Sequence, residues 1–235
     1  MSHIRLLGGF SLTEPVYAPT SFGSRRLLAY LALKPTAITR ASIAGTLWPE
    51  ANDHRAGLSL RSTLTRMDPA HRLLLDIGPT TLGLSRDVEV DLHSSHRLAV
   101  RLLPIDLTPS LSDISISAVA ALSEELLPDW YDEWVVAAAE DWRALRMNGL
   151  EVQTRELLKR RRLPEAGVAA RAAIAVEPLR ESAQAALIRV HLAEGNPSEA
   201  LRVYRRYSVL LDGALGLAPT IALAALIRDH DTSDS

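Results

Sequence analysis

Two segments of the sequence share identical residues at positions that are 34 residues apart. They are LPEAGVAARAAI at 163–174 and NPSEALRVYRRY at 196–207. The positions that are identical at this offset are Glu165 and Glu199, Ala166 and Ala200, and Arg171 and Arg205. A repeat of this length is typical of helix pairs that stack on one another, because a single pair cannot bury its own apolar face. The second half of the chain is therefore predicted to be a helical repeat.

Helical spacing of apolar residues extends over most of this half. It predicts helices over 118–127, 132–160, 164–176, 180–194, 197–211 and 219–229. The predicted breaks between them are Pro164, Pro178, the turn Gly195-Asn196-Pro197, Gly213 and Pro219. The segment PIDLTPSLSDISIS at 104–117 is rich in Pro and Ser, which predicts a loop.

The first half has a different pattern. Alternation in HIRLLGGFSL predicts two short strands, 4–7 and 10–12, joined by Gly8-Gly9, where glycine permits the positive φ of a tight turn. A helix is predicted to begin with Ser24 as its cap and to end at Pro35. A second helix is predicted from a cap at Thr39 to Pro49, and its expected inner face is Ile43, Ala44, Leu47 and Trp48.

A third helix is predicted over HRAGLSLRSTLTRM at 54–67, with Asn52 or Asp53 as its cap. Its expected inner stripe is Ala56, Leu60, Leu64 and Met67. The opposite arc comprises His54, Leu58, Arg61, Ser62 and Thr65, flanked by Arg55 and Arg66. After Asp68-Pro69, the runs RLLLD, IGPTT and LGLS predict a strand, a turn and a return strand.

Strands, three helices and a hairpin in this order predict an α+β winged helix-turn-helix domain over 1–92, followed by an all-α tetratricopeptide-like domain over 93–235. The third helix of such a domain enters the major groove, where arginine reaches guanine O6 and N7 and an apolar group touches a thymine methyl. The predicted base-contacting residues are Arg55, Leu58, Arg61, Ser62, Thr65 and Arg66. Contacts to phosphates or from the wing are assigned to Arg25 or Arg26, Arg40, Thr80, Thr81 and Arg86.

The amino-acid composition further narrows the classes of protein to which this chain can belong. Residues 1–86 hold ten Lys and Arg against five Asp and Glu, whereas the remainder holds 16 against 23, so the two parts of the sequence differ in charge. Cysteine is absent, which excludes disulfides and thiolate metal sites. With no membrane span or secretion signal in the pattern, we expect a cytoplasmic protein that does not associate with membranes.

Other patterns have more than one interpretation. The aromatic residues Trp130, Tyr131, Trp134 and Trp142 suit a ligand pocket or a base-stacking platform, but apolar neighbours favour core packing. The run Arg160-Arg161-Arg162 is of a kind that binds nucleic acid. The simpler interpretation is that it lies at the end of a long helix, where cations complement the helix dipole. His93 and His96 have the spacing of metal ligands but no third ligand nearby in sequence. Without a phosphate loop or nucleophile elbow, we expect no enzyme activity, no cofactor and no metal.

Several segments also resemble a known family. IRLLGGFSL, SRRLLAYLAL, RASIAGTLWPE, LRSTLTRM and VEVDL resemble the DNA-binding half of the Streptomyces antibiotic regulatory protein (SARP) family. LLPDWYDEWV, EPLRESAQAALIRVHLAEGNPSEALRVYRRY and LGLAP look like its bacterial transcriptional activator domain. These eight segments follow the family's order over nearly the whole chain. No P-loop follows the helical part, so the resemblance is to the short members without an ATPase.

This resemblance implies a transcription activator that binds direct repeats upstream of a promoter and recruits RNA polymerase through its sigma or alpha subunit. It also implies that the helical domain self-associates as a homodimer. In the family the segment between the second and third helices contacts polymerase, and here it comprises Trp48, Pro49, Glu50, Ala51, Asn52, Asp53 and His54. Two alternatives remain open: a scaffold whose winged domain does not bind DNA, and a repressor that uses the same DNA-binding fold.

Overall fold

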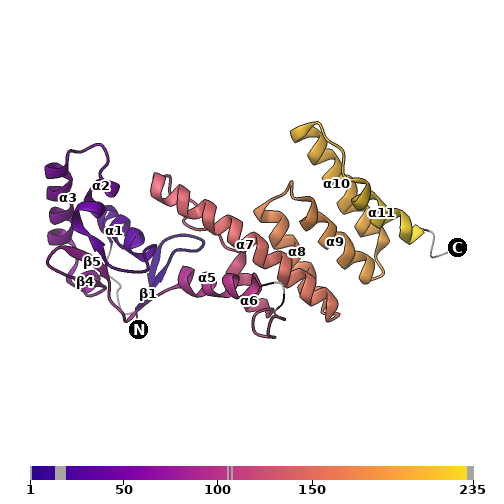
Figure 1. Ribbon diagram of the computed structural model, residues 1–235, viewed down its shortest axis with the longest axis horizontal. Helices are drawn as coiled ribbons and strands as arrows, with labels where there is room; N and C mark the ends of the chain where they lie inside the picture. The colour runs from indigo at the N-terminus through magenta and orange to yellow at the C-terminus, as the bar shows by residue number, and fades with distance from the viewer. Residues whose placement is uncertain (1, 14–19, 105, 107, 232–235) are drawn as a thin grey trace. The chain divides into compact units, whose positions relative to one another are not determined.

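The computed structural model describes residues 2–13, 20–104, 106 and 108–231 (Figure 1). The chain forms two compact units. Unit 1 comprises 1–94 together with 125–142, and unit 2 comprises 95–124 together with 143–235. Packing thus groups 125–142 with the N-terminal segment. A single domain boundary near residue 92 stays a prediction.

Unit 1 contains a three-stranded sheet of order β2-β1-β6. β1 (Ser2–Arg5) and β2 (Ser11–Thr13) are antiparallel, with Ile4 opposite Leu12, and β6 (Val88–Val90) runs parallel to β1. The two predicted strands are confirmed, and the turn contains Gly8 and Gly9 at φ 72° and 129°. β1 ends earlier than predicted because the backbone N–H groups of Leu6 and Leu7 donate to the Asp91 carboxylate, at 2.8 and 3.1 Å.

Residues 125–142 belong to unit 1 because they pair with the chain just after β1 and pack into the core. Gly8 N–H donates to the Glu125 carbonyl at 2.7 Å, and Leu127 N–H donates to the Leu6 carbonyl at 3.0 Å. The Trp134 ring lies edge-on to Tyr30 at 5.2 Å between centroids. Core packing is therefore the correct interpretation for Trp134, whereas Tyr131 is 85% exposed.

Three helices follow the first hairpin. α1 (Phe22–Ala32) is capped by Ser21, whose Oγ accepts from the Ser24 N–H at 3.2 Å, so the prediction of Ser24 as the cap is wrong. α2 (Arg40–Leu47) is capped by Thr39 as predicted. α3 (Asp53–Arg66) is capped by Asn52, whose Oδ1 accepts from the Arg55 N–H at 3.0 Å.

Unit 1 also contains a second sheet of order β3-β5-β4. Two of its strands, β4 and β5, follow α3 in the chain. The short helix α4 (Pro69–Arg72) leads into the predicted hairpin, β4 (Leu75–Ile77) and β5 (Thr81–Leu84), which is confirmed. A strand that was not predicted, β3 (Ile38–Thr39), pairs with β5 just before α2. α1 packs on β5 and α3, and α2 packs on α3, so the three helices and this sheet share one core (Figure 1).

The remaining elements are all helices, and all of them except α5 correspond to predicted helices. They are α5 (Asp91–Leu102), α6 (Ile116–Ser123), α7 (Glu133–Lys159), α8 (Leu163–Val176), α9 (Glu181–Ala193), α10 (Pro197–Leu215) and α11 (Ile221–Asp231). α5 was not predicted. α10 continues through Gly213, where a break was expected. It is capped at its C-terminus by Gly216, which adopts the left-handed backbone conformation with a φ of 66°.

The helical repeat of unit 2 is built from α8 to α11. α9 packs against both α8 and α10, and α11 packs against α9 and α10. Ala170, Ile188, Ala200, Tyr207 and Leu223 share one buried cluster. Because Ala170 and Ala200 carry small side chains, neighbouring helices approach closely at this cluster.

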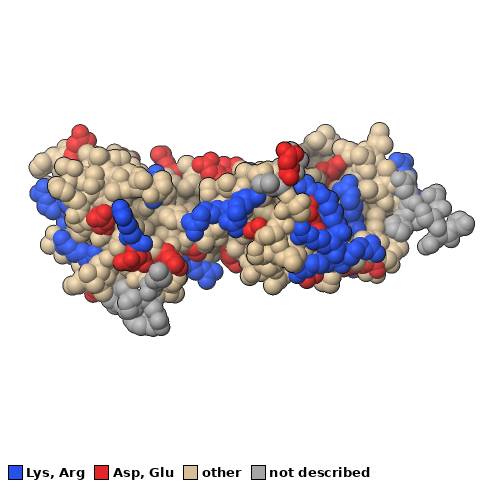
Figure 2. Space-filling model, turned by 60° about the horizontal axis from the view of Figure 1, so that its bottom comes forward, with Lys and Arg blue, Asp and Glu red and all other residues tan. Residues whose placement is uncertain are grey.

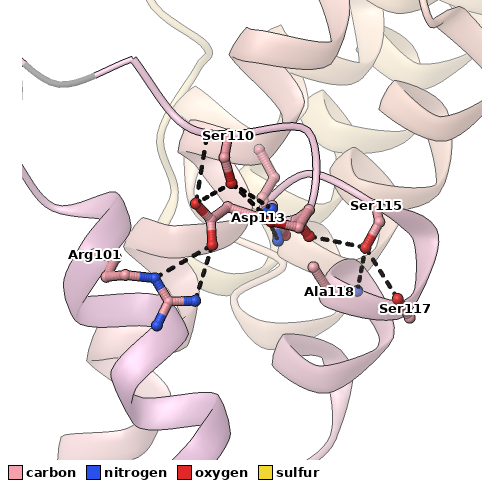
Figure 3. A network of polar contacts seen from close by, with 8 residues as sticks. Arg101, Ser110, Asp113, Ser115, Ser117 and Ala118 are labelled. Carbon is pink, nitrogen blue, oxygen red and sulfur yellow. Dashed lines mark hydrogen bonds and ion pairs between the residues drawn. The ribbon is translucent and has the colours of Figure 1, made fainter.

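The loop predicted over 104–117 ends earlier, because Ile116 and Ser117 begin α6. The described residues between α5 and α6 contain no helix or strand and are held by Asp113 (Figure 3). The Asp113 carboxylate accepts from Arg101 Nη2 at 2.9 Å and from Ser110 Oγ at 2.6 Å, and Gln153 donates to its carbonyl at 2.8 Å. Burial raises the pKa of Asp113, but the hydrogen bonds from Ser110 and Arg101 and the Arg101 charge outweigh burial and lower it.

Candidate DNA-binding surface

The two sides of α3 differ in their burial, as the spacing of apolar residues predicts. Its inner stripe is buried, with Ala56, Leu60, Leu64 and Met67 each at most 5% exposed. The exposed residues of the outer side are His54, Arg55, Leu58, Arg61, Thr65 and Arg66, and Ser62 is half-buried. The structure therefore brings all six predicted base-contacting residues together on the solvent side of one helix.

The three arginines of this side carry unneutralised charge. Within the described chain, Arg55, Arg61 and Arg66 take part in no ion pair. The only acidic residue of α3 is Asp53 in its first turn. The outer side of α3 is therefore a cationic surface with an exposed aliphatic residue, Leu58, which is 45% exposed.

One hydroxyl group of the outer side, that of Thr65, is bonded within the helix. Thr65 Oγ1 donates to the Arg61 carbonyl oxygen at 2.9 Å, so its hydrogen is already engaged within the helix. Its lone pairs can still accept a hydrogen bond from a base amino group. The Thr65 hydroxyl group is therefore suited to accepting a hydrogen bond from a base rather than donating one.

The turn between β4 and β5 is the candidate wing. It comprises Gly78, Pro79 and Thr80, and the Gly78 N–H donates to the Thr81 carbonyl at 3.1 Å. Thr80 is exposed and Thr81 is half-buried. Arg86 is exposed too, but it follows the opposite end of β5 from this turn. The tip of the wing therefore presents a hydroxyl group rather than a cation.

Arg40 holds this turn in place. Its Nη2 donates to the Gly78 carbonyl at 3.0 Å and its backbone N–H donates to the Thr80 carbonyl at 2.9 Å. A cavity of about 330 Å³ between α2 and α3 is lined by Arg40, Arg61 and Asp53, together with small residues of both helices. Arg40 and Arg61 therefore border the same hollow.

Arg25 and Arg26 are neighbours on α1 with different surroundings. Arg26 forms an ion pair with Asp132, in which the two side chains are 18% and 23% exposed. Arg25 is exposed and has no ion pair in the described chain. Of the two, Arg25 has the guanidinium group available for a phosphate.

The segment between α2 and α3 borders a second hollow of about 390 Å³. Its lining includes Trp48, Pro49, Glu50 and Ala51, together with Arg26 of α1 and Arg55 of α3. Trp48 is half-buried, whereas Pro49 and Glu50 are exposed. This segment therefore offers an apolar recess with cationic groups beside it.

The other candidate residues have structural contacts. Arg160 Nη2 donates to the Pro109 carbonyl at 2.8 Å, and Arg162 pairs with Glu165 at 2.8 Å. His93 Nε2 lies 2.8 Å from the Ala32 carbonyl oxygen. Across the residues that the structure describes, no group of three or more His, Cys, Asp or Glu side chains is placed to hold a metal ion. No helix in that part of the chain has the length and hydropathy needed to cross a bilayer.

Comparison with known proteins agrees with this architecture. Residues 114–229 match the family model of the bacterial transcriptional activator domain. The solved structure of Mycobacterium tuberculosis EmbR in complex with a low-affinity phosphopeptide matches with a TM-score of 0.59 and 21% sequence identity, over 97% of this chain and 64% of that chain. No curated protein matches this sequence. The winged-helix and helical-repeat fold is thus confirmed, and residues 114–229 are similar to the bacterial transcriptional activator domain.

Proposed function

We propose that this protein is a sequence-specific DNA-binding transcription activator, which binds repeats upstream of a promoter and recruits RNA polymerase. The observation that carries the proposal is the outer side of α3, where Arg55, Arg61 and Arg66 are exposed without ion pairs. An unneutralised cationic helix face in this fold suits the major groove. Arginine there discriminates guanine by its O6 and N7 acceptors, and Leu58 suits a thymine methyl.

Contacts to DNA phosphates would fix the position of α3 along the major groove. The Arg25 side chain of α1 is exposed and takes part in no ion pair in the described chain, and Thr80 is exposed at the wing. Arg40 keeps its guanidinium group against the Gly78 carbonyl, so its main contribution is to position the wing. Because each neutralised phosphate releases counterions, binding should weaken steeply with salt.

The recess beside Trp48 and Glu50 supports a polymerase contact in the same unit. Pro49 and Glu50 are exposed and precede α3, so they are not part of the outer side of the helix that would lie against DNA. We assign polymerase recruitment to residues 48–54 for this reason, together with the family's behaviour.

The test of DNA binding is an electrophoretic mobility shift with the protein's own upstream DNA, over a salt series and against random competitor DNA. Specific retention that weakens with salt supports the proposal. Absence of retention at low salt contradicts it and favours a scaffold.

Recruitment is tested separately, by in vitro transcription with purified polymerase. The wild type should raise transcript yield, whereas Glu50→Lys should retain DNA binding and lose activation. A fall in yield on addition of the wild type would instead show a repressor.

A further inference from the structure

Unit 1 is net acidic, although it carries the cationic side of α3. It contains 10 Lys and Arg against 14 Asp and Glu, because the segment 125–142 adds six acidic and no basic residues. On the face of the molecule drawn in Figure 2, Lys and Arg side chains gather over the helices of unit 2. Two arginines that border one cavity of unit 1 are therefore a local concentration of positive charge in an acidic unit.

This cavity, of about 330 Å³ between α2 and α3, is lined by charged groups of both signs. Arg40 and Arg61 contribute guanidinium groups, and Asp53 contributes a carboxylate. None of these three side chains takes part in an ion pair in the described chain. Asp53 and Arg61 are eight residues apart on α3, which separates their Cα atoms by about 12 Å along the helix axis. The cavity therefore holds separated charges that the protein does not neutralise.

Two glycines of the cavity are not explained by the fold. Gly45 of α2 and Gly57 of α3 lie inside helices, where glycine is less stable than alanine. Neither has a positive φ, and a Cβ built at either position meets nothing within 4 Å. Neither helix packing nor backbone conformation therefore requires glycine here. Because both residues line the cavity, their common effect is to keep space open beside the helix backbone.

The uncharged lining of the cavity is apolar. Ala44, Ala56 and Leu60 contribute to it and are each at most 3% exposed. A DNA phosphate would match the arginines, but it would leave this lining uncovered and would bring negative charge towards Asp53. An organic molecule with an apolar body covers the lining. The volume lies near the lower end of the range for small-molecule sites, about 300 to 1,000 Å³, which suits a ligand of amino-acid size.

We propose that the cavity between α2 and α3 binds a small zwitterion, a molecule with a carboxylate and an ammonium group at the two ends of an aliphatic body. The carboxylate pairs with Arg61 and Arg40, and the ammonium group pairs with Asp53. The aliphatic body lies against the backbone at Gly45 and Gly57. The ligand thus supplies one charge of each sign to a cavity that presents both signs.

Such a ligand would also control DNA binding, because Arg61 belongs to the predicted base-contacting set. A carboxylate that holds the Arg61 guanidinium group removes it from the major groove. By linkage, bound DNA weakens the affinity for the zwitterion by the same factor. This control of DNA binding rests on the proposed function, but binding of the zwitterion in the cavity does not.

The test is a titration of the full, isotope-labelled chain with ε-aminocaproate, followed by the amide NMR resonances of Gly45 and Gly57. These resonances should shift and saturate with a dissociation constant of about 1 mM or tighter. Caproate lacks the ammonium group and hexylamine lacks the carboxylate. Each of these two probes should bind at least about tenfold more weakly than ε-aminocaproate, because each leaves one charge of the cavity unpaired.

Variants assign the binding to the cavity. Gly45→Leu with Gly57→Leu fills the open space and should abolish binding of ε-aminocaproate. The matched control is Gly213→Leu, at a glycine inside α10 where a Cβ also meets nothing within 4 Å, and it should bind like the wild type. Circular dichroism checks that the variants fold, which leucine favours because it is a better helix former than glycine.

Two charge variants test the roles of the ends of the ligand. Arg61→Ala should weaken both ε-aminocaproate and caproate by at least about tenfold. Asp53→Asn should weaken ε-aminocaproate by a similar factor without weakening caproate. Both residues are exposed, so these variants decide the proposal even if the double leucine variant does not fold.

Three outcomes overturn the proposal. The first is the absence of any shift at Gly45 and Gly57 up to about 10 mM ε-aminocaproate. The second is unchanged binding by the folded double leucine variant. The third is equal affinity for caproate and ε-aminocaproate, which would show a site for simple anions. Loss of DNA binding by the double variant, without any binding of ε-aminocaproate to the wild type, would assign the cavity to a DNA phosphate instead.

A second readout uses DNA. Saturating ε-aminocaproate should weaken specific DNA binding in a mobility shift by about fivefold or more, whereas hexylamine at the same concentration should not. Unchanged DNA affinity would overturn the control of DNA binding, while the titration would still decide the zwitterion site. Failure to bind any DNA would refute the proposed function and would leave the titration equally decisive.

Discussion

Arg40 Nη2 donates a hydrogen bond of 3.0 Å to the carbonyl oxygen of Gly78, which joins the start of α2 to the turn between β4 and β5. The N–H of the same arginine donates to Thr80 at 2.9 Å. The side chain and the backbone of Arg40 therefore both connect the helix-turn-helix to the wing, next to the pairing of β3 with β5. Removing that side chain tests whether the wing depends on α2 for its position.

Arg40→Ala should lower the free energy of unfolding by about 1 kcal/mol, the usual net value of a hydrogen bond. Urea denaturation measures the change. Arg25→Ala is the matched control, because the exposed Arg25 side chain makes no hydrogen bond in the described chain, and its effect should stay within about 0.5 kcal/mol. Equal effects of the two substitutions would show that the bond to Gly78 does not hold the wing.

Arg61→Ala should weaken binding to the specific DNA site by about 1 to 3 kcal/mol and relax base preference at one position. The reason is loss of a bidentate contact to guanine. Footprinting and competition with single-base variants of the site measure both effects. Arg97→Ala, which removes the same charge from α5, should leave the footprint unchanged. An unaltered footprint for Arg61→Ala would remove Arg61 from the base-contacting set.

Gly57→Ala should stabilise the folded chain by about 0.5 to 1 kcal/mol, because alanine favours helix over glycine. A Cβ at this position of α3 meets nothing within 4 Å. At Gly149 of α7 a Cβ would lie 2.7 Å from Leu122 Cδ1. Gly149→Ala should therefore destabilise by about 1 to 3 kcal/mol through overpacking. Thermal denaturation of the two variants should give shifts of opposite sign, and shifts of the same sign would contradict this packing.

Asp113→Asn should destabilise the loop between α5 and α6 near neutral pH and less so in acid. The pKa of Asp113 lies below its usual value of 3.8, so its ionised form stabilises the folded chain above that value, and this contribution is lost as pH falls through the lowered pKa. Urea unfolding at neutral pH and in steps below about pH 4 should show the wild type and variant converging in acid.

The control for this prediction is Asp129→Asn, at an exposed carboxylate that forms no ion pair in the described chain. It should leave the free energy of unfolding near neutral pH unchanged within about 0.5 kcal/mol. A difference between wild type and Asp113→Asn that stays constant with pH would show that the charge of Asp113 does not stabilise the loop.

The helices with strong apolar spacing were predictable from sequence. The helix predicted over 132–160 spans 133–159, and Thr39 caps α2 as expected. Ser24 was predicted as the first cap, but serine suits this role at more than one position, and only the structure shows Ser21 Oγ accepting the Ser24 N–H. β6 was not predicted because its parallel partner, β1, lies far away in sequence and leaves no local trace.

The same distinction applies to the candidate site. The outer side of α3 follows from helical periodicity, so every residue predicted there lies there. The sequence could not show that the guanidinium groups of Arg26 and Arg40 are bonded within the protein, because their partners are remote in sequence. Asp132 is 106 residues from Arg26, and Gly78 is 38 residues from Arg40. Periodicity places a side chain on a surface, whereas tertiary contacts decide whether its charge is free.

The hydrogen bond from Leu127 N–H to the Leu6 carbonyl has a consequence for biosynthesis. A ribosome that has made only the first 92 residues has not yet supplied the backbone that covers the Leu6 edge, nor the indole that meets Tyr30. The nascent N-terminal segment must therefore wait for the beginning of α7 to leave the exit tunnel before its core closes. Recombinant fragments cut after residue 92 should be prone to aggregate, whereas fragments that extend through Trp142 include the whole unit.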